Sequence, residues 1–313
     1  MVLTNITALR LALALMVGAV LIATGCSGGS AVEDISKSQQ VAHNPRTDGM
    51  RQLMLHFNGL DDLGDDYVYE GWFIVDGAPY STGRFSAEPG GKPFNARFDV
   101  NEEMADNASL FVLTIEPAVG DDPAPAATHI LAGPFKGASA RLGVGHGAAL
   151  GSDFSEATGE FLLATPSTGD PADDYNLGIW WVDPGAGPGP SLHLPTLPAG
   201  WAYEGWAVVG GTPYSTGRFL DAGMTDSDGA GPTSGPFPGP PFPGQDFIDP
   251  PLDLLGGTAV ITVEPEPDNS AAPFTLKPLV GPIPEDLPVG TLSPMDNNAR
   301  ATNPTGIATI VGP

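Results

Sequence analysis

The sequence is poor in cysteine and in positive charge. Cys26 is its one cysteine in 313 residues, which excludes disulfide bonds within the chain. Only 12 Lys and Arg accompany 37 Asp and Glu, so the formal net charge is −25. A field of this sign repels the phosphates of nucleic acids and anionic lipid headgroups, and we expect no nucleic-acid partner.

Motifs of catalysis and metal binding are missing as well. No Gly-x-Ser-x-Gly nucleophile motif occurs. The five histidines form no His-x-His or His-x-x-His pair that would indicate a zinc site. The acidic stretch 61–66 lacks the oxygen spacing of an EF-hand loop. We therefore expect a non-enzymatic protein without a metal or another cofactor.

No apolar segment reaches the length of a comfortable membrane span, and the longest one is typical of an export signal. The apolar run 11–24 falls short of the roughly 20 residues of a membrane span but suits the core of a secretory signal. It ends in ATGC, residues 23–26, which resembles the lipobox of bacterial lipoproteins. We expect residues 1–25 to be a signal peptide, Cys26 to be lipidated at the membrane of the cell envelope, and residues 26–50 to be a flexible tether. An ordinary signal peptide with a stray cysteine is the alternative.

One block of sequence occurs twice. Residues 69–85, YEGWFIVDGAPYSTGRF, return as residues 203–219, YEGWAVVGGTPYSTGRF, with 13 of 17 positions identical. Further along, FVLTIEP at 111–117 corresponds to AVITVEP at 259–265. The spacing between the two blocks is longer in the second copy, which places an insertion in the Pro- and Gly-rich residues 222–251.

The composition of the segments predicts an all-β protein. Short runs rich in β-branched and aromatic residues alternate with Gly, Pro, Asn and Asp clusters, and no sustained apolar period of 3.6 residues occurs. About seven such runs per copy are typical of a β-sandwich. We expect two tandem β-sandwich domains at 51–150 and 151–295, followed by a C-terminal tail at 296–313.

The repeated block predicts a β-hairpin with candidate functional side chains. Because strand side chains alternate, Glu70 and Trp72 share one face. The return strand brings Thr82 or Gly83 close to Trp72 and Arg84 or Phe85 close to Glu70, and a glycine opposite the indole would leave room for the ring. We interpret the tryptophan as a buried core anchor and the charged residues as a cross-strand ion pair. An exposed tryptophan that grips a glycan or peptide is the alternative. The equivalent residues of the second copy are Glu204, Trp206 and Arg218.

Two further carboxylates recur at strand ends. Glu116 and Glu264 each precede a proline, a position where capping a turn is the common role. Glu70 with Glu116 is also a candidate carboxylate pair for glycoside hydrolysis. Their recurrence in both copies favours the structural interpretation.

Taken in order, these motifs resemble the extracytoplasmic domain of the anti-sigma-K factor family. The matching residues in the first copy are Tyr69, Trp72, Gly77, Pro79, Gly83, Phe85, Glu116 and Pro117. Those in the second copy are Tyr203, Trp206, Gly211, Pro213, Gly217, Phe219, Glu264 and Pro265. The resemblance implies an outer module for sensing or protein contact. Sigma-factor binding in that family belongs to a cytoplasmic N-terminal segment that we do not recognise here, so we expect no direct sigma-factor binding.

The expected function is therefore that of a non-enzymatic, lipid-anchored interaction or sensing module of the cell envelope, with a protein or glycan as ligand. One alternative is a regulator of an extracytoplasmic-function sigma factor that acts through a partner. The other is a carbohydrate-binding or carbohydrate-active protein that uses Glu70 or Glu204 beside the tryptophan.

Processing at Cys26 is directly testable. Mass spectrometry of the mature chain should give Cys26 as the N-terminal residue with acyl chains attached, because the apolar run ends at the lipobox-like tetrapeptide. The Cys26→Ser variant should carry no lipid. An unmodified mature chain, or cleavage at another bond, would contradict this prediction.

Overall fold

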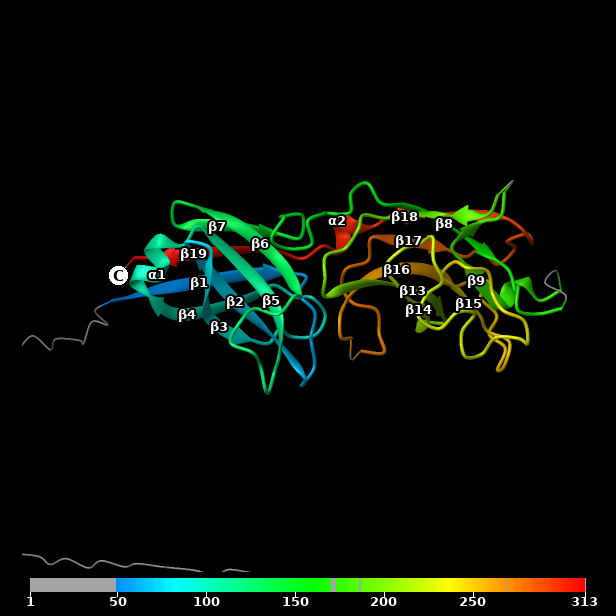
Figure 1. Ribbon diagram of the computed structural model, residues 1–313, viewed down its shortest axis with the longest axis horizontal. Helices are drawn as coiled ribbons and strands as arrows, with labels where there is room; N and C mark the ends of the chain where they lie inside the picture. Colours follow the sequence, from blue (N-terminus) through cyan, green and yellow to red (C-terminus); the bar gives the residue numbers. More distant parts are fainter. Residues whose placement is uncertain (1–48, 170–172, 186, 269, 313) are drawn as a thin grey trace, which may run out of the picture. The chain divides into compact units, whose positions relative to one another are not determined.

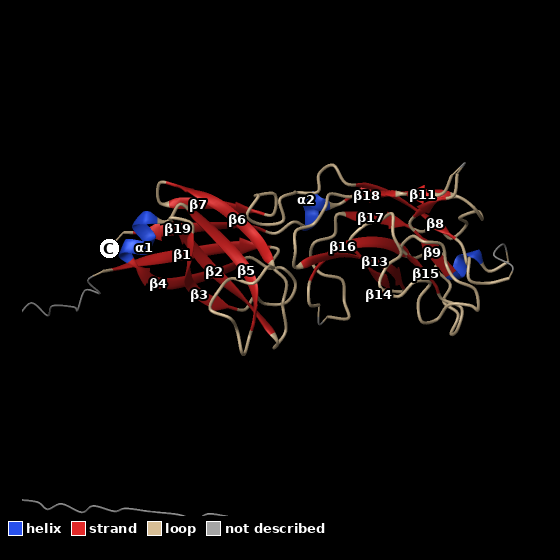
Figure 2. Cartoon of the chain, viewed as in Figure 1, coloured by secondary structure: helices blue, strands red, loops and turns tan. Residues whose placement is uncertain are grey.

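The computed structural model describes residues 49–169, 173–185, 187–268 and 270–312, and within them nearly all regular structure is β-strand (Figure 2). The exceptions are short: α1 (Glu102–Asn107), α2 (Ala299–Thr302) and the 3₁₀ turn η1 (Tyr175–Leu177). Over these ranges no helix has the length and apolar character needed to cross a membrane. The all-β prediction is confirmed, whereas the predicted signal peptide, Cys26 and the tether up to residue 48 lie outside the described residues. Met50, the last residue of the expected tether, is the first residue of β1.

The first sheet has eight strands in the order β3-β2-β5-β6-β7-β19-β1-β4, all antiparallel (Figure 1). Its strands are β1 (Met50–Asn58), β2 (Tyr67–Val75), β3 (Ala78–Phe85), β4 (Phe94–Asn101), β5 (Leu110–Pro117), β6 (His129–Lys136), β7 (Ser139–Gly143) and β19 (Thr305–Val311).

The second sheet has nine strands, of which eight follow the order β14-β13-β16-β17-β18-β8-β9-β15, and β12 pairs with β8. Its strands are β8 (Thr158–Leu163), β9 (Gly178–Trp180), β12 (Leu192–His193), β13 (Trp201–Val209), β14 (Thr212–Phe219), β15 (Gly244–Asp246), β16 (Thr258–Pro265), β17 (Leu279–Pro282) and β18 (Leu292–Asn297). A separate two-stranded ribbon pairs β10 (Val182–Asp183) with β11 (Gly189–Pro190).

Each sheet is nearly closed, because its two end strands approach each other through side chains. In the first sheet, Phe85 of β3 stacks on Phe94 of β4 with ring centroids 5.1 Å apart. In the second, β14 and β15 lie in contact. The twist of antiparallel sheets favours this curling, which buries the inward row of each strand.

The repeated block forms the predicted hairpin of β2 and β3, with a local shift in register. The turn has positive φ at Asp76 (51°) and Gly77 (81°), as a two-residue hairpin turn requires. Glu70 and Arg84 are Cα partners as expected, but a bulge after Gly71 places Ser81 opposite Trp72. The expectation that Gly83 lies opposite the indole is therefore wrong.

Gly83 instead makes room for a ring from another strand. Its φ is 126°, and a Cβ at this position would lie 2.4 Å from the ring of Phe98 in β4. Phe98 thus packs directly on the β3 backbone and helps to close the first sheet.

Two strands that begin Thr-Gly are exchanged between the copies. Thr158 of β8 and Thr305 of β19 are 147 residues apart, close to the 148 that separate Glu116 from Glu264. Along the chain β8 follows β7, and β19 follows β18. Yet β19 lies between β7 and β1 in the first sheet, and β8 lies between β18 and β9 in the second. When each repeat is counted through its Thr-Gly strand, β8 belongs to the first repeat and β19 to the second, so each sheet contains the Thr-Gly strand of the other repeat.

This exchange corrects the expected domain boundaries. Residues 296–313 were expected to be a tail, but β19 (Thr305–Val311) pairs with β1 and β7 along its length. Residues 47–313 accordingly form one compact unit. The copies do not separate at residue 150, because a fragment ending there would leave β1 and β7 without the strand between them.

The insertion at 222–251 is largely irregular, and its end adds a strand. Residues 244–246 form β15, which pairs with β9 at the end of the sheet. Phe237 is exposed, but Phe242 is buried against Trp180 and Val182. The insertion thus contributes to the packing of the second sheet.

A substitution on β19 tests the strand exchange. Ala308 is fully buried opposite Leu55, whereas its neighbour Ile307 is 38% exposed. Ala308→Asp should destabilise the protein by about 3–5 kcal/mol, because it buries an unpaired charge. Ile307→Asp is the control and should cost far less. Thermal melts of both variants measure the difference, and an Ala308→Asp variant that melts like the wild type would contradict the placement of β19.

Candidate functional site

The carboxylate of Glu70 lies at the centre of a polar cluster on the outer face of β2 and β5. Ser81 Oγ donates a hydrogen bond to Glu70 Oε1, and Arg84 Nε lies 3.4 Å from Glu70 Oε2. The Arg84 guanidinium also donates to the carbonyl oxygen of Pro117 and lies 3.6 Å from Asp121. The ion pair predicted from the hairpin register is present in this copy.

The indole of Trp72 connects this cluster to Glu116. Trp72 Nε1 donates to Thr114 Oγ1 at 2.9 Å, and the Thr114 hydroxyl donates to Glu116 Oε1. The amide of Ala126 donates to the same carboxylate oxygen at 2.9 Å. Glu116 thus holds the loop that follows β5, in agreement with the turn-capping role expected for it.

The second copy repeats most of this arrangement. Trp206 Nε1 donates to Thr262 Oγ1 at 2.9 Å, and Ser215 Oγ donates to Glu204 Oε1. Glu264 accepts hydrogen bonds from the Thr262 hydroxyl and, at 2.9 Å, from the amide of Phe274.

The arginine differs in its ion pair only: like Arg84, Arg218 donates to the carbonyl oxygen of the strand-end proline, here Pro265 at 3.4 Å. Arg218 and Glu204 are Cα partners, but the Arg218 guanidinium pairs with Glu266. The Glu204–Arg218 ion pair expected from the sequence does not appear among the described contacts. Glu266 follows β16 in the chain, and the first copy has Ala118 at the corresponding position. Because a glutamate replaces this alanine in the second copy, Arg218 has the Glu266 carboxylate as an ion-pair partner.

Burial decides between the two interpretations of the tryptophans. Trp72 is 3% exposed and Trp206 is 2% exposed, so neither ring can stack on a ligand from solution. Trp72 packs with Val112, Ala132 and Ala149 in a small cluster separate from the main core. The indoles are thus buried as expected, but Trp72 anchors the outer face of its sheet instead of the interior.

Burial also raises the pKa of three of the recurrent carboxylates. Desolvation raises the pKa of Glu116, although hydrogen bonds from Thr114 and Ala126 partly offset it. Desolvation likewise raises the pKa of Glu204, and that of Glu264 to about 7. With exposures of 5% for Glu70 and 0% for Glu116, the proposed glycosidase pair has no surface for a sugar.

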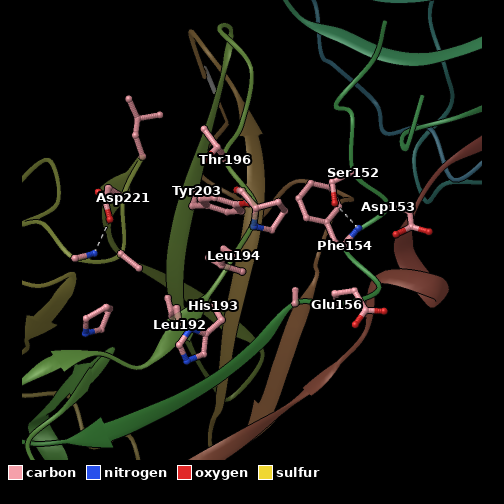
Figure 3. A pocket seen from close by; sticks show the side chains of 16 residues that line it. Ser152, Asp153, Phe154, Glu156, Leu192, His193, Leu194, Thr196, Tyr203 and Asp221 are labelled. Atoms are coloured by element: carbon pink, nitrogen blue, oxygen red, sulfur yellow. Dashed lines mark hydrogen bonds between the residues drawn. The ribbon is translucent and has the colours of Figure 1, made fainter. Parts of the chain in front are cut away.

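An open cleft of about 700 Å³ lies elsewhere in the structure (Figure 3). Its lining residues come from three segments of the chain, 152–157, 190–196 and 220–223, together with Tyr203. Figure 3 shows His193, Leu194 and Thr196 between Asp221 on one side and Ser152 to Glu156 on the other. The Tyr203 hydroxyl donates to the Pro195 carbonyl oxygen at 2.6 Å and holds the central segment in place.

The cleft combines acidic and aliphatic side chains. Asp153, Glu156 and Asp221 provide negative charge, and Leu220 at its edge is 70% exposed. No sequence motif indicates this site, because its three segments belong to loops and short strands. Of the residues named in the sequence analysis, only the repeat residue Tyr203 lines it, together with one of the five histidines, His193.

The comparisons with known proteins concern the first copy. Residues 11–134 match the family model described as anti-sigma-K factor rskA, C-terminal. The matched range includes β1 to β5 and ends in β6, so it contains Glu70, Trp72, Arg84 and Glu116. No curated protein and no solved structure gave a match. The family match supports the resemblance to the outer domain of anti-sigma-K factors for this part of the chain.

Paired threonine substitutions test whether the polar clusters stabilise both copies. Thr114→Val and Thr262→Val keep the side-chain shape but leave the indole N–H without a partner and remove one of the hydrogen bonds to the glutamate. Each should cost about 1–3 kcal/mol in the free energy of unfolding, measured by urea denaturation. Thr212→Val, on an exposed position of β14, is the control. Equal stability of all three variants would show that the clusters contribute nothing.

Proposed function

We propose that this protein is an exported, lipid-anchored module of the cell envelope, with two tandem sandwich-like copies, that binds another protein and regulates instead of catalysing. The observation that carries the proposal is the match of residues 11–134 to the C-terminal domain of anti-sigma-K factors. We infer that any effect on a sigma factor passes through the bound partner.

The interior of the molecule supports a binding role. The recurrent Glu, Trp and Thr side chains, which would be the natural candidates for catalysis or sugar binding, are buried and hydrogen-bonded to one another. They stabilise the two sheets. This arrangement favours neither hydrolysis nor stacking of a carbohydrate.

The cleft of Figure 3 is the surface on which we place the partner. Its exposed Leu220 offers apolar contact area, and its three carboxylates favour positive charge. The chain as a whole carries a net charge of −25, which strengthens this preference. The expected ligand is therefore a segment of an envelope protein that combines Lys or Arg with aliphatic residues.

Site-specific crosslinking in living cells tests the proposal. A photoreactive amino acid at position 220 should give a light-dependent adduct with one envelope protein, which Asp221→Lys should weaken at least tenfold because it reverses the charge of the cleft. Val289 is 55% exposed and lies outside the cleft, so the same label there is the matched control. Identical adducts at 220 and 289, or none at 220, would contradict the assignment.

A further inference from the structure

Three carboxylates of the second copy converge at the end of β16. Ligand oxygens of Glu204, Glu264 and Asp268 all lie within 4.8 Å of one another. Glu204 comes from β13 and Glu264 from β16, and Asp268 from the loop that follows. An acidic cluster alone is common on protein surfaces, but this one is largely interior: Glu204 is 4% exposed and Glu264 is 0% exposed.

Two of the oxygens have no partner among the described residues. Glu204 Oε1 and Glu264 Oε1 accept hydrogen bonds, whereas Glu204 Oε2 and Glu264 Oε2 are buried and accept none. A buried, unpaired carboxylate oxygen is costly, and such oxygens normally bind a proton donor or a metal ion. The two unpartnered oxygens belong to the same converging group.

Two cations interact with this group through their charges, Arg218 with Glu204 and Lys277 with Glu264, but without a close ion pair among the described residues. Arg218 pairs with Glu266, and Lys277 Nζ donates to the carbonyl oxygens of Pro273 and Phe274. In the described part of the chain, neither forms an ion pair with the three carboxylates. Asp268 is half-buried, so water and ions have access to the group from its side.

The first copy provides an internal comparison. There, Arg84 lies 3.4 Å from Glu70 Oε2 and 3.6 Å from Asp121, so a guanidinium compensates the equivalent carboxylate. The described residues of that copy contain no group of three possible metal ligands. Glu116 Oε2 of the first copy is buried and unpartnered like Glu264 Oε2, so the copies differ at the other glutamate: Glu70 Oε2 has Arg84 beside it, whereas Glu204 Oε2 has no partner among the described residues.

We propose that Glu204, Glu264 and Asp268 bind a hard divalent cation, with Ca²⁺ as the best fit. All three ligands are carboxylates, which suit Ca²⁺ and not the softer metals that prefer nitrogen or sulfur. Three carboxylates provide up to six oxygens when bidentate, and water on the Asp268 side completes the shell. The site would fix the loop after β16 to β13, as Arg84 fixes the corresponding loop of the first copy.

Binding is measured on the full chain after removal of metal with a chelator. Titration calorimetry should give one Ca²⁺ per chain, with a dissociation constant of about 10⁻⁴–10⁻³ M as in other extracellular modules. Tb³⁺ should bind at the same site and show emission sensitised by tryptophan. Trp206→Phe should reduce this emission, because its indole is linked to Glu264 through Thr262.

Matched variants distinguish binding of the cation at these three carboxylates from nonspecific attraction of cations to an acidic protein. Asp268→Asn, a change at a half-buried position, should weaken binding at least tenfold, and Glu264→Gln should abolish it. Glu116→Gln, the change equivalent to Glu264→Gln in the first copy, and Asp121→Asn, in the loop after β5, should leave it unchanged. Absence of saturable binding of Ca²⁺, Mg²⁺ and Mn²⁺ by the folded chain would overturn the proposal, as would equal losses in both copies. In that case the buried pair would share a proton.

Discussion

The structure depends on the requirement that every inner strand finds hydrogen-bond partners on both edges. In the first sheet, β19 lies between β7 and β1 and pairs with both. This strand is formed by the last residues of the described chain, and without it β7 and β1 would each have an unpaired edge. The same requirement in the second sheet is met by β8. Reciprocal exchange of equivalent strands makes the two repeats into one compact unit, and this explains why a boundary near residue 150, plausible from the repeat alone, does not hold.

On this scaffold, burial gives the recurrent polar residues a structural role. The hydrogen bond from the Trp indole to the Thr hydroxyl is 2.9 Å long in both copies. Each Thr hydroxyl in turn donates a hydrogen bond to the glutamate at the end of its strand. Charges inside such clusters must be compensated. At this cluster the two copies differ in the position of the arginine, because Arg84 lies beside Glu70 whereas Arg218 pairs with Glu266.

Local features were predictable from the sequence, and long-range ones were not. Alternation of side chains and the turn chemistry at Gly77 place Arg84 opposite Glu70, because both depend on neighbouring residues only. The bulge after Gly71 shifts Trp72 by one position, and nothing in the local pattern signals it. The Arg218 guanidinium pairs with Glu266, which lies in the loop that follows β16 and is distant from Arg218 in the sequence. The sequences of β8 and β19 are typical of strands, but they do not indicate which sheet each strand joins.

Engineered disulfides test the strand exchange most directly. Met54 of β1 and Thr309 of β19 are Cα partners, and neighbouring antiparallel strands have the Cα spacing that a disulfide needs. In a Cys26→Ser background, cysteines at positions 54 and 309 should crosslink within the chain on mild oxidation. The exchange predicts no crosslink between positions 54 and 162, since Leu162 of β8 pairs with Leu292 and Trp180 in the second sheet. A crosslink at 54 and 162 in place of 54 and 309 would show that each copy keeps its own strand, and would contradict the account.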